Sequence, residues 1–74
     1  MEEKIISIIS NHCPNVQSIN MYSDLFYDLG ISSLKMISLI TDIEKELEIT
    51  VDFREFHDVH TVNDLILYCK GLHK

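Results

Sequence analysis

The sequence has few residues that break helices and few that carry positive charge. Its 74 residues include two glycines, one proline and no tryptophan. Such low glycine and proline counts disfavour a turn-rich all-β design and favour helices. Six basic residues stand against twelve acidic ones, which gives a formal charge of −6. We therefore expect no nucleic-acid binding, because basic patches supply most of that affinity, and the acidic balance suits a partner with a basic surface.

Sequence features of export and membrane insertion are also missing. No apolar run approaches the roughly 20 residues of a membrane span. The start, Met1-Glu2-Glu3-Lys4, lacks the basic region of a signal peptide. Cys13 and Cys69 have no CxxC spacing, so in a reducing compartment we expect buried or half-buried thiols and no disulfide. We expect a cytoplasmic, monomeric protein that forms one domain over residues 1–74, with no membrane partner.

The histidines do not predict a metal site. His57 and His60 are three residues apart, a spacing that would place them on one helix face. No cysteine or dense carboxylate cluster lies close to them in sequence, whereas structural zinc sites require four ligands. We interpret both as solvated residues of a connecting segment.

Hydrophobic periodicity predicts three main helices. The first covers residues 3–12 and stops before Pro14, because a proline disfavours helix in the residue before it. The second and strongest covers residues 33–47, and Leu34 lies opposite its apolar stripe. The third opens at Thr61, where Asp64 completes a capping box, and runs to about Lys70. Residues predicted to face the core are Ile5, Ile8, Ile9, Met36, Leu39, Ile40, Ile43, Leu47, Val62, Leu65, Ile66 and Cys69.

The segments between these helices complete the predicted architecture. Residues 13–31 form a long first loop in which Val16, Ile19, Leu25, Phe26 and Leu29 should pin the chain across the helices. Ser23-Asp24 is expected to cap a single turn. Residues 51–59 predict a short helix or turn with aromatic anchors, and Gly71 a C-terminal helix cap. The predicted fold is all-α, a small four-helix bundle of three main helices and one short helix.

Two adjacent serines begin the second helix, in the stretch DLGISSLKM. Ser32 suits the N-cap, a role that serine often has. Ser33 follows one residue later, where unpaired N–H groups and the helix dipole would favour a phosphate on its hydroxyl. Spacing and composition alone do not separate a modified serine from one that only caps the helix.

A family resemblance adds to this interpretation. The segments LFYDLGISSLKMISLITDIEKELEITV and TVNDL resemble the acyl and peptidyl carrier protein family, in order and over nearly the whole chain. The resemblance implies that Ser33 receives 4′-phosphopantetheine from coenzyme A through a phosphopantetheinyl transferase. It also implies that the arm carries an acyl, aminoacyl or peptidyl thioester to loading and condensing enzymes. In acyl carriers the chain can enter between the helices, here near Met36, Leu39, Ile40 and Phe53.

The sequence departs from the family pattern in two places. Asp or His most often precedes the modified serine, whereas this chain has Ser32. Fatty-acid carriers have acidic early turns in this helix, whereas here those turns show Lys35 and Ser38. We therefore expect partner docking to depend on Ser32, Leu34, Lys35 and Ser38 more than on carboxylates.

Several alternatives remain open from the sequence. The protein is expected to be a carrier in fatty acid, polyketide or related biosynthesis and not an enzyme; the alternatives are an aminoacyl or peptidyl carrier of nonribosomal peptide synthesis and an unmodified helical interaction module. A serine hydrolase is disfavoured because the G-x-S-x-G elbow and its preceding strand are missing. The chain ends favour a free-standing protein over an excised domain, and the cargo and pathway are not specified.

Overall fold

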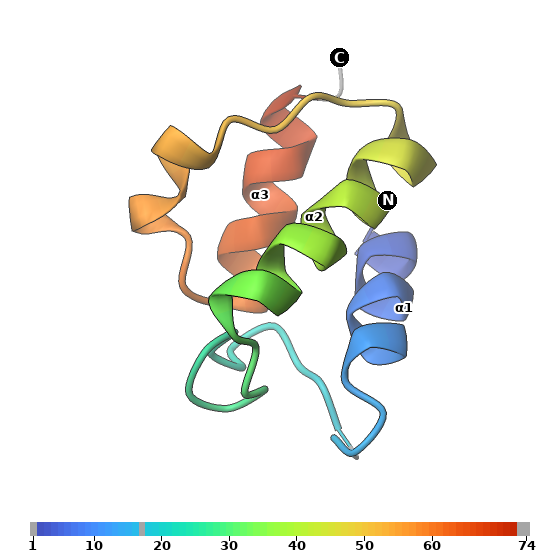
Figure 1. Cartoon of the computed structure of the whole chain (residues 1–74), viewed down its shortest axis with the longest axis vertical. Coiled ribbons are helices and arrows are strands. Elements are labelled where there is room, and N and C mark those ends of the chain that lie inside the picture. Colours follow the sequence, from blue (N-terminus) through green and yellow to red (C-terminus); the bar gives the residue numbers. More distant parts are fainter. Residues whose placement is uncertain (1, 17, 73–74) are drawn as a thin grey trace.

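The computed structural model describes residues 2–16 and 18–72 and contains three α-helices and one 3-10 helix. These are α1 (Glu2–His12), α2 (Ser33–Leu47), η1 (Phe53–Asp58) and α3 (Val62–Leu72). Helix α1 packs against both α2 and α3, and α2 crosses in front of α3 in Figure 1. Within the described ranges there is no strand, only an isolated antiparallel bridge between Asp24 and Thr61. The predicted all-α bundle with one short helix is confirmed.

One hydrophobic core joins the apolar stripes of the three α-helices. Each of the twelve helix residues that periodicity assigned to the core is buried, from Ile5 in α1 to Cys69 in α3. Both cysteines are buried free thiols, and burial raises the pKa of Cys69 to about 11. His12 lies at the edge of the core, where its Nε2 is 2.6 Å from a carboxylate oxygen of Asp42. This contact links α1 to α2.

The helix ends show which local predictions were right. Helix α2 has the predicted bounds, whereas α1 begins one residue earlier, at Glu2. The predicted C-cap at Gly71 is wrong, because α3 continues through Gly71 to Leu72 and this glycine has no positive φ. A glycine permits a left-handed cap but does not require one, and within a helix it costs only about 0.5–1 kcal/mol.

The first loop is held against the start of α3. The N–H of Val62 donates to the carbonyl of Ser23 at 3.0 Å, and the N–H of Leu25 donates to the carbonyl of His60 at 2.8 Å. Leu25 and Leu29 are buried, as predicted, but the expected anchor Phe26 is 44 % exposed. The N–H groups of Phe26 and Tyr27 donate to Asp24, so this aspartate caps a turn as predicted. The loop therefore carries the chain to the start of α2 along a fixed path.

Candidate functional site

The two serines at the start of α2 have different local roles. Gly30 has a φ of +66°, a conformation that costs glycine little, and it turns the loop toward the helix. Ser32 has extended backbone angles, and its hydroxyl accepts a hydrogen bond from the N–H of Lys35 at 3.2 Å. Ser32 is therefore the N-cap, and Ser33 is the first helical residue with an exposed side chain.

The start of α2 offers free hydrogen-bond donors. Among the described residues no hydrogen bond to the N–H of Ser33 or Leu34 is found, and no acidic side chain lies in the first turn. The positive end of the helix dipole is therefore not neutralised within the first turn. A phosphate ester on the Ser33 hydroxyl would lie beside these donors, so the residues present fit a phosphopantetheine attachment.

An apolar groove of about 470 Å³ opens beside Ser33. Such a volume falls in the usual range for small-ligand sites. The prediction that Met36 and Phe53 lie at a cavity is confirmed, but Leu39 and Ile40 are fully buried in the core and do not line this groove. The lining comes from the loop, α2 and η1: Phe26, Ser33, Met36, Ile37, Phe53 and Phe56. Phe26, Ile37 and Phe56 were missed because periodicity predicts burial in the core and not membership of a surface groove.

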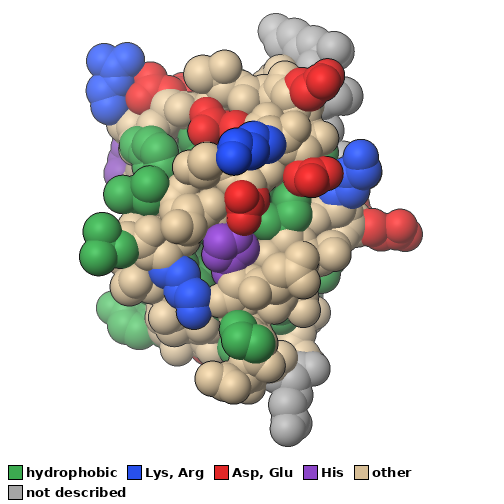
Figure 2. All heavy atoms as spheres, turned by 45° about the vertical axis from the view of Figure 1, so that its right-hand side comes forward, with side chains coloured by type: hydrophobic (Ala, Val, Ile, Leu, Met, Phe, Trp, Pro, Cys, Tyr) green, Lys and Arg blue, Asp and Glu red, His purple; other side chains and the backbone are tan. Residues whose placement is uncertain are grey.

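The first turns of α2 around Ser33 are exposed, and the first turn carries no acidic side chain. Leu34 is 80 % exposed and Ile37 is 52 % exposed, so Leu34 does lie off the core stripe as predicted. Ser32, Lys35 and Ser38 are exposed beside them, which brings the four predicted docking residues to the first turns of α2. The acidic residues Asp42, Glu44, Glu46 and Glu48 belong to the other end of the helix. In Figure 2 the acidic side chains of the visible face gather in its upper half, the half in which α2 ends in Figure 1.

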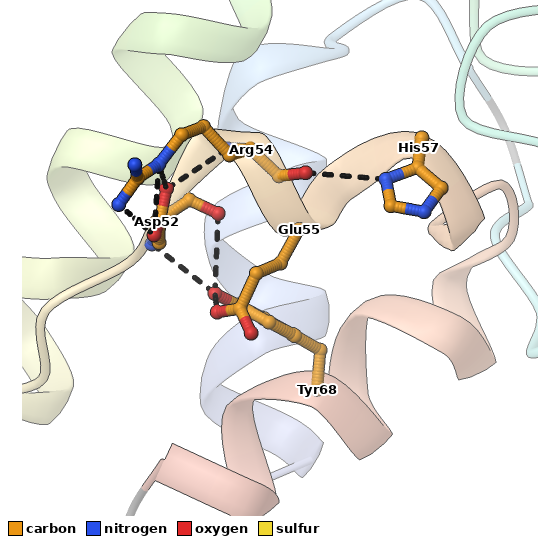
Figure 3. A network of polar contacts seen from close by, with 5 residues as sticks. All are labelled: Asp52, Arg54, Glu55, His57 and Tyr68. Carbon is orange, nitrogen blue, oxygen red and sulfur yellow. Dashed lines mark hydrogen bonds and ion pairs between the residues drawn. The ribbon is translucent and has the colours of Figure 1, made fainter.

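The 3-10 helix η1 supplies one wall of the groove and is tied to α3 through Tyr68. The hydroxyl of Tyr68 lies 2.9 Å from Oε1 of Glu55 and accepts a hydrogen bond from the N–H of Asp52 at 3.1 Å (Figure 3). Its ring packs edge-on against Phe56, with 5.2 Å between ring centroids. Burial raises the pKa of Tyr68, and the Glu55 carboxylate adds to this effect, so the hydroxyl keeps its proton at neutral pH.

The remaining polar residues do not form a second candidate centre. His57 and His60 are exposed, and His57 contacts the carbonyl of Arg54 at 3.1 Å and Asp58 at 3.4 Å. Residues 2–16 and 18–72 contain no group of three or more side chains that could hold a metal ion. Over the same ranges, no helix is long and apolar enough to cross a bilayer.

Comparisons with known proteins agree with this geometry. Residues 3–69 match the family described as "Phosphopantetheine attachment site". An acyl carrier protein of Rickettsia bellii is 31 % identical over 71 residues, covering 95 % of this chain and 83 % of that protein. An acyl carrier protein of Clostridium acetobutylicum is 33 % identical over 70 residues, covering 93 % of this chain and 91 % of that protein.

A solved structure extends the similarity to three dimensions. A Mycobacterium tuberculosis protein assigned as an acyl carrier protein superposes with a TM-score of 0.86 and 33 % identity, covering 95 % of each chain. The resemblance inferred from the serine motif is therefore confirmed. The chain belongs to the acyl carrier protein family, whose members carry acyl groups on covalently attached 4′-phosphopantetheine.

Proposed function

We propose that the hydroxyl of Ser33 is the attachment point for 4′-phosphopantetheine, which a phosphopantetheinyl transferase delivers from coenzyme A. One observation supports this choice over Ser32. Ser33 combines an exposed hydroxyl, free helix-end N–H groups and a position at the edge of the apolar groove. The hydroxyl of Ser32, in contrast, is already engaged as the helix cap.

The loaded protein acts as a carrier and not as a catalyst. The terminal thiol of the phosphopantetheine arm holds the intermediate as a thioester. Tethering raises the effective concentration of that intermediate for each partner enzyme. Apart from the hydroxyl of Ser33, the groove is lined by apolar aliphatic, thioether and aromatic side chains, which favour an alkyl or aryl chain over a charged aminoacyl group. Fatty acid or polyketide biosynthesis is therefore the proposed setting, and nonribosomal peptide synthesis is the alternative.

Partner enzymes are proposed to dock on the first turns of α2. Leu34 is the central contact, with Ser32, Lys35 and Ser38 around it, because these side chains are exposed next to Ser33. The partners are the transferase, the enzymes that load the acyl group and the condensing enzymes that use it. We place the monomeric carrier domain in the cytosol, a compartment with which the two free cysteines are compatible.

Loading of three matched proteins tests the attachment site. The wild type, Ser33→Ala and Ser32→Ala are incubated with coenzyme A, magnesium and a broad-specificity transferase and then weighed by mass spectrometry. We expect one added phosphopantetheine on the wild type and none on Ser33→Ala. Ser32→Ala should still be modified, at a lower rate, because only the cap is lost.

The same experiment separates the competing functions. Modification of Ser33→Ala would overturn the site assignment. A wild type that no transferase modifies would favour an unmodified interaction module, in which the serines serve only as cap and first turn.

A further inference from the structure

The short helix η1 stands between two hollows in the surface. On one side, Phe53 and Phe56 line the groove that opens at Ser33. On the other side lies a second hollow of about 440 Å³, to which Leu67 and Tyr68 of α3 contribute. The η1 residues that line this second hollow are Arg54, Glu55, His57 and Asp58. Because both sides of η1 border a hollow, this short helix has space in which to shift.

Little of η1 is anchored in the core. None of its six residues is buried, whereas Val51 and Val59, just outside its two ends, are buried. The bonds made by Arg54 are local, since both its N–H and its guanidinium donate to the side chain of Asp52. Such local bonds shape the turn but do not fix its distance from α2. Segments with few buried contacts are those that open most readily.

Tyr68 provides the described hydrogen bonds between the η1 region and α3. Its hydroxyl accepts from the N–H of Asp52 at 3.1 Å and lies 2.9 Å from Glu55 Oε1 and 3.3 Å from the carbonyl of Asp52. A phenol has one proton, so it donates to one acceptor at a time, and the carboxylate is the nearer and stronger. Figure 3 shows the Tyr68 side chain reaching from α3 toward both partners.

Ring contacts extend this link to the groove. Tyr68 packs edge-on against Phe56, and Phe56 lies 5.6 Å from Phe53 between ring centroids. Both phenylalanines line the groove at Ser33. A shift of η1 away from α2 would therefore move the wall that faces the proposed cargo, and the second hollow lies on that side.

We propose that Tyr68 is a positioning residue that fixes the distance of η1 from α2 and so limits the length of acyl chain that the groove accommodates. With the hydroxyl bonds intact, η1 is held at a fixed position on α3, and the groove between η1 and α2 keeps its size. With those bonds released, a longer chain can displace η1 from α2, and the groove accommodates that chain. This inference rests on the proposed function of the groove as the place of the acyl chain.

Hydrogen exchange of Tyr68→Phe tests the structural part, because that change removes the hydroxyl and keeps the ring. The amides of Glu55 and Val59, which donate to Asp52 and Phe56 within the η1 turn, report its opening. We expect them to exchange about tenfold faster, since a hydrogen bond to a charged group shifts an equilibrium by about that factor. Tyr22→Phe is the matched control, because Tyr22 is 86 % exposed and its hydroxyl makes no hydrogen bond within the described residues.

Thioester protection tests the functional part. Phosphopantetheine-loaded wild type and Tyr68→Phe are acylated with saturated chains from butyryl to hexadecanoyl, and cleavage by hydroxylamine is timed. We expect Tyr68→Phe to protect the longest chains several-fold better, relative to octanoyl, than the wild type does. Glu55→Ala removes the carboxylate that accepts from the Tyr68 hydroxyl, so it should also improve protection of the longest chains. Tyr22→Phe should leave the dependence of cleavage rate on chain length unchanged.

The outcomes distinguish the inference from the function on which it rests. Cleavage rates that do not depend on chain length in the wild type would overturn the groove assignment itself. A clear length dependence that is identical in the wild type and in both Tyr68→Phe and Glu55→Ala would leave the groove in place and overturn the role of Tyr68.

Discussion

The helices α2 and α3 both begin with a hydroxyl cap but differ in how many of their first N–H groups find an acceptor. At the start of α3, Thr61 and Asp64 cap each other, with both hydrogen bonds at 3.1 Å, and Asp64 also accepts the N–H of His60. The N–H groups of Val62 and Asn63 donate to carbonyls of the first loop. At the start of α2, Ser32 supplies one capping bond, and among the described residues the next two N–H groups have no acceptor.

This difference separates a structural helix end from a functional one. The start of α3 is complete, because its donors are satisfied by the protein and an acidic side chain meets the dipole. At the start of α2 the N–H groups of Ser33 and Leu34 have no acceptor within the described residues, and no acidic side chain lies in the first turn. An exposed leucine and an apolar groove border this helix end. An end that the fold leaves incomplete is suited to a group added later.

Removing Leu34 should produce the largest change, and only at the functional end. Leu34→Ala should lower kcat/KM for loading by the transferase about tenfold, because burial of a leucine on docking contributes about 1.5 kcal/mol. The free energy of unfolding should hardly change, since this side chain is 80 % exposed. Leu67→Ala, at a leucine 58 % exposed on α3, is the control. Equal loading of Leu34→Ala and wild type would remove Leu34 from the docking surface.

Breaking the cap of α3 should lower the stability of the protein and leave its loading unchanged, the reverse of Leu34→Ala. Thr61→Ala removes the acceptor for the N–H of Asp64 and should lower the free energy of unfolding by about 1 kcal/mol, measured by urea titration. Loading of Ser33 should continue at the wild-type rate below the melting transition. Thr50→Ala, at an exposed threonine, provides the matched control. If Thr61→Ala is fully folded but is loaded much more slowly than the wild type, the starts of α2 and α3 are coupled.

The charge of Asp64 should contribute less to the free energy of unfolding than the Thr61 cap does, and this contribution should depend on pH. Hydrogen bonds from the N–H groups of His60 and Thr61 lower the pKa of Asp64, so its ionised form is stabilised by folding. Its contribution is present above the ordinary value near 3.8 and is lost as the pH falls through the lower native pKa. After solvent screening, Asp64→Asn should cost about 0.5 kcal/mol at neutral pH.

The difference between wild type and Asp64→Asn should disappear as the pH falls through the lowered native pKa of Asp64, because the wild-type carboxylate then becomes protonated. Thermal unfolding across this range provides the measurement. Asp58→Asn, at an exposed carboxylate of η1, is measured alongside as the control variant. If wild type and Asp64→Asn differ in stability by the same amount at acidic and neutral pH, the charge of Asp64 does not contribute to the cap.

The sequence allowed local features to be predicted closely. The apolar stripe of α2 predicted its bounds, and the Thr61–Asp64 pair predicted a capping box that the structure contains. Both depend on residues within one or two turns of each other, so pattern alone is sufficient. The family resemblance likewise depends on a contiguous motif at Ser33.

Features that depend on long-range contacts were not predictable. The Tyr68 hydroxyl reaches Asp52 across 16 residues, and the side chain of Glu44 accepts the N–H of Val51 at 2.9 Å. Helix α2 ends with Glu48 at a φ of 56°, in a conformation where glycine is usual. The groove combines the loop, α2 and η1, and no single periodicity describes such a surface.

The central claim is that Ser33, and not Ser32, carries the cofactor. Trypsin cuts after Lys4 and Lys35, so one peptide of the loaded wild type contains both serines near its C-terminal end. Fragmentation should then show the phosphopantetheine mass on the fragment of residues 33–35 and not on the fragment of residues 34–35. An added mass that appears only once Ser32 is included in the fragment would contradict the account.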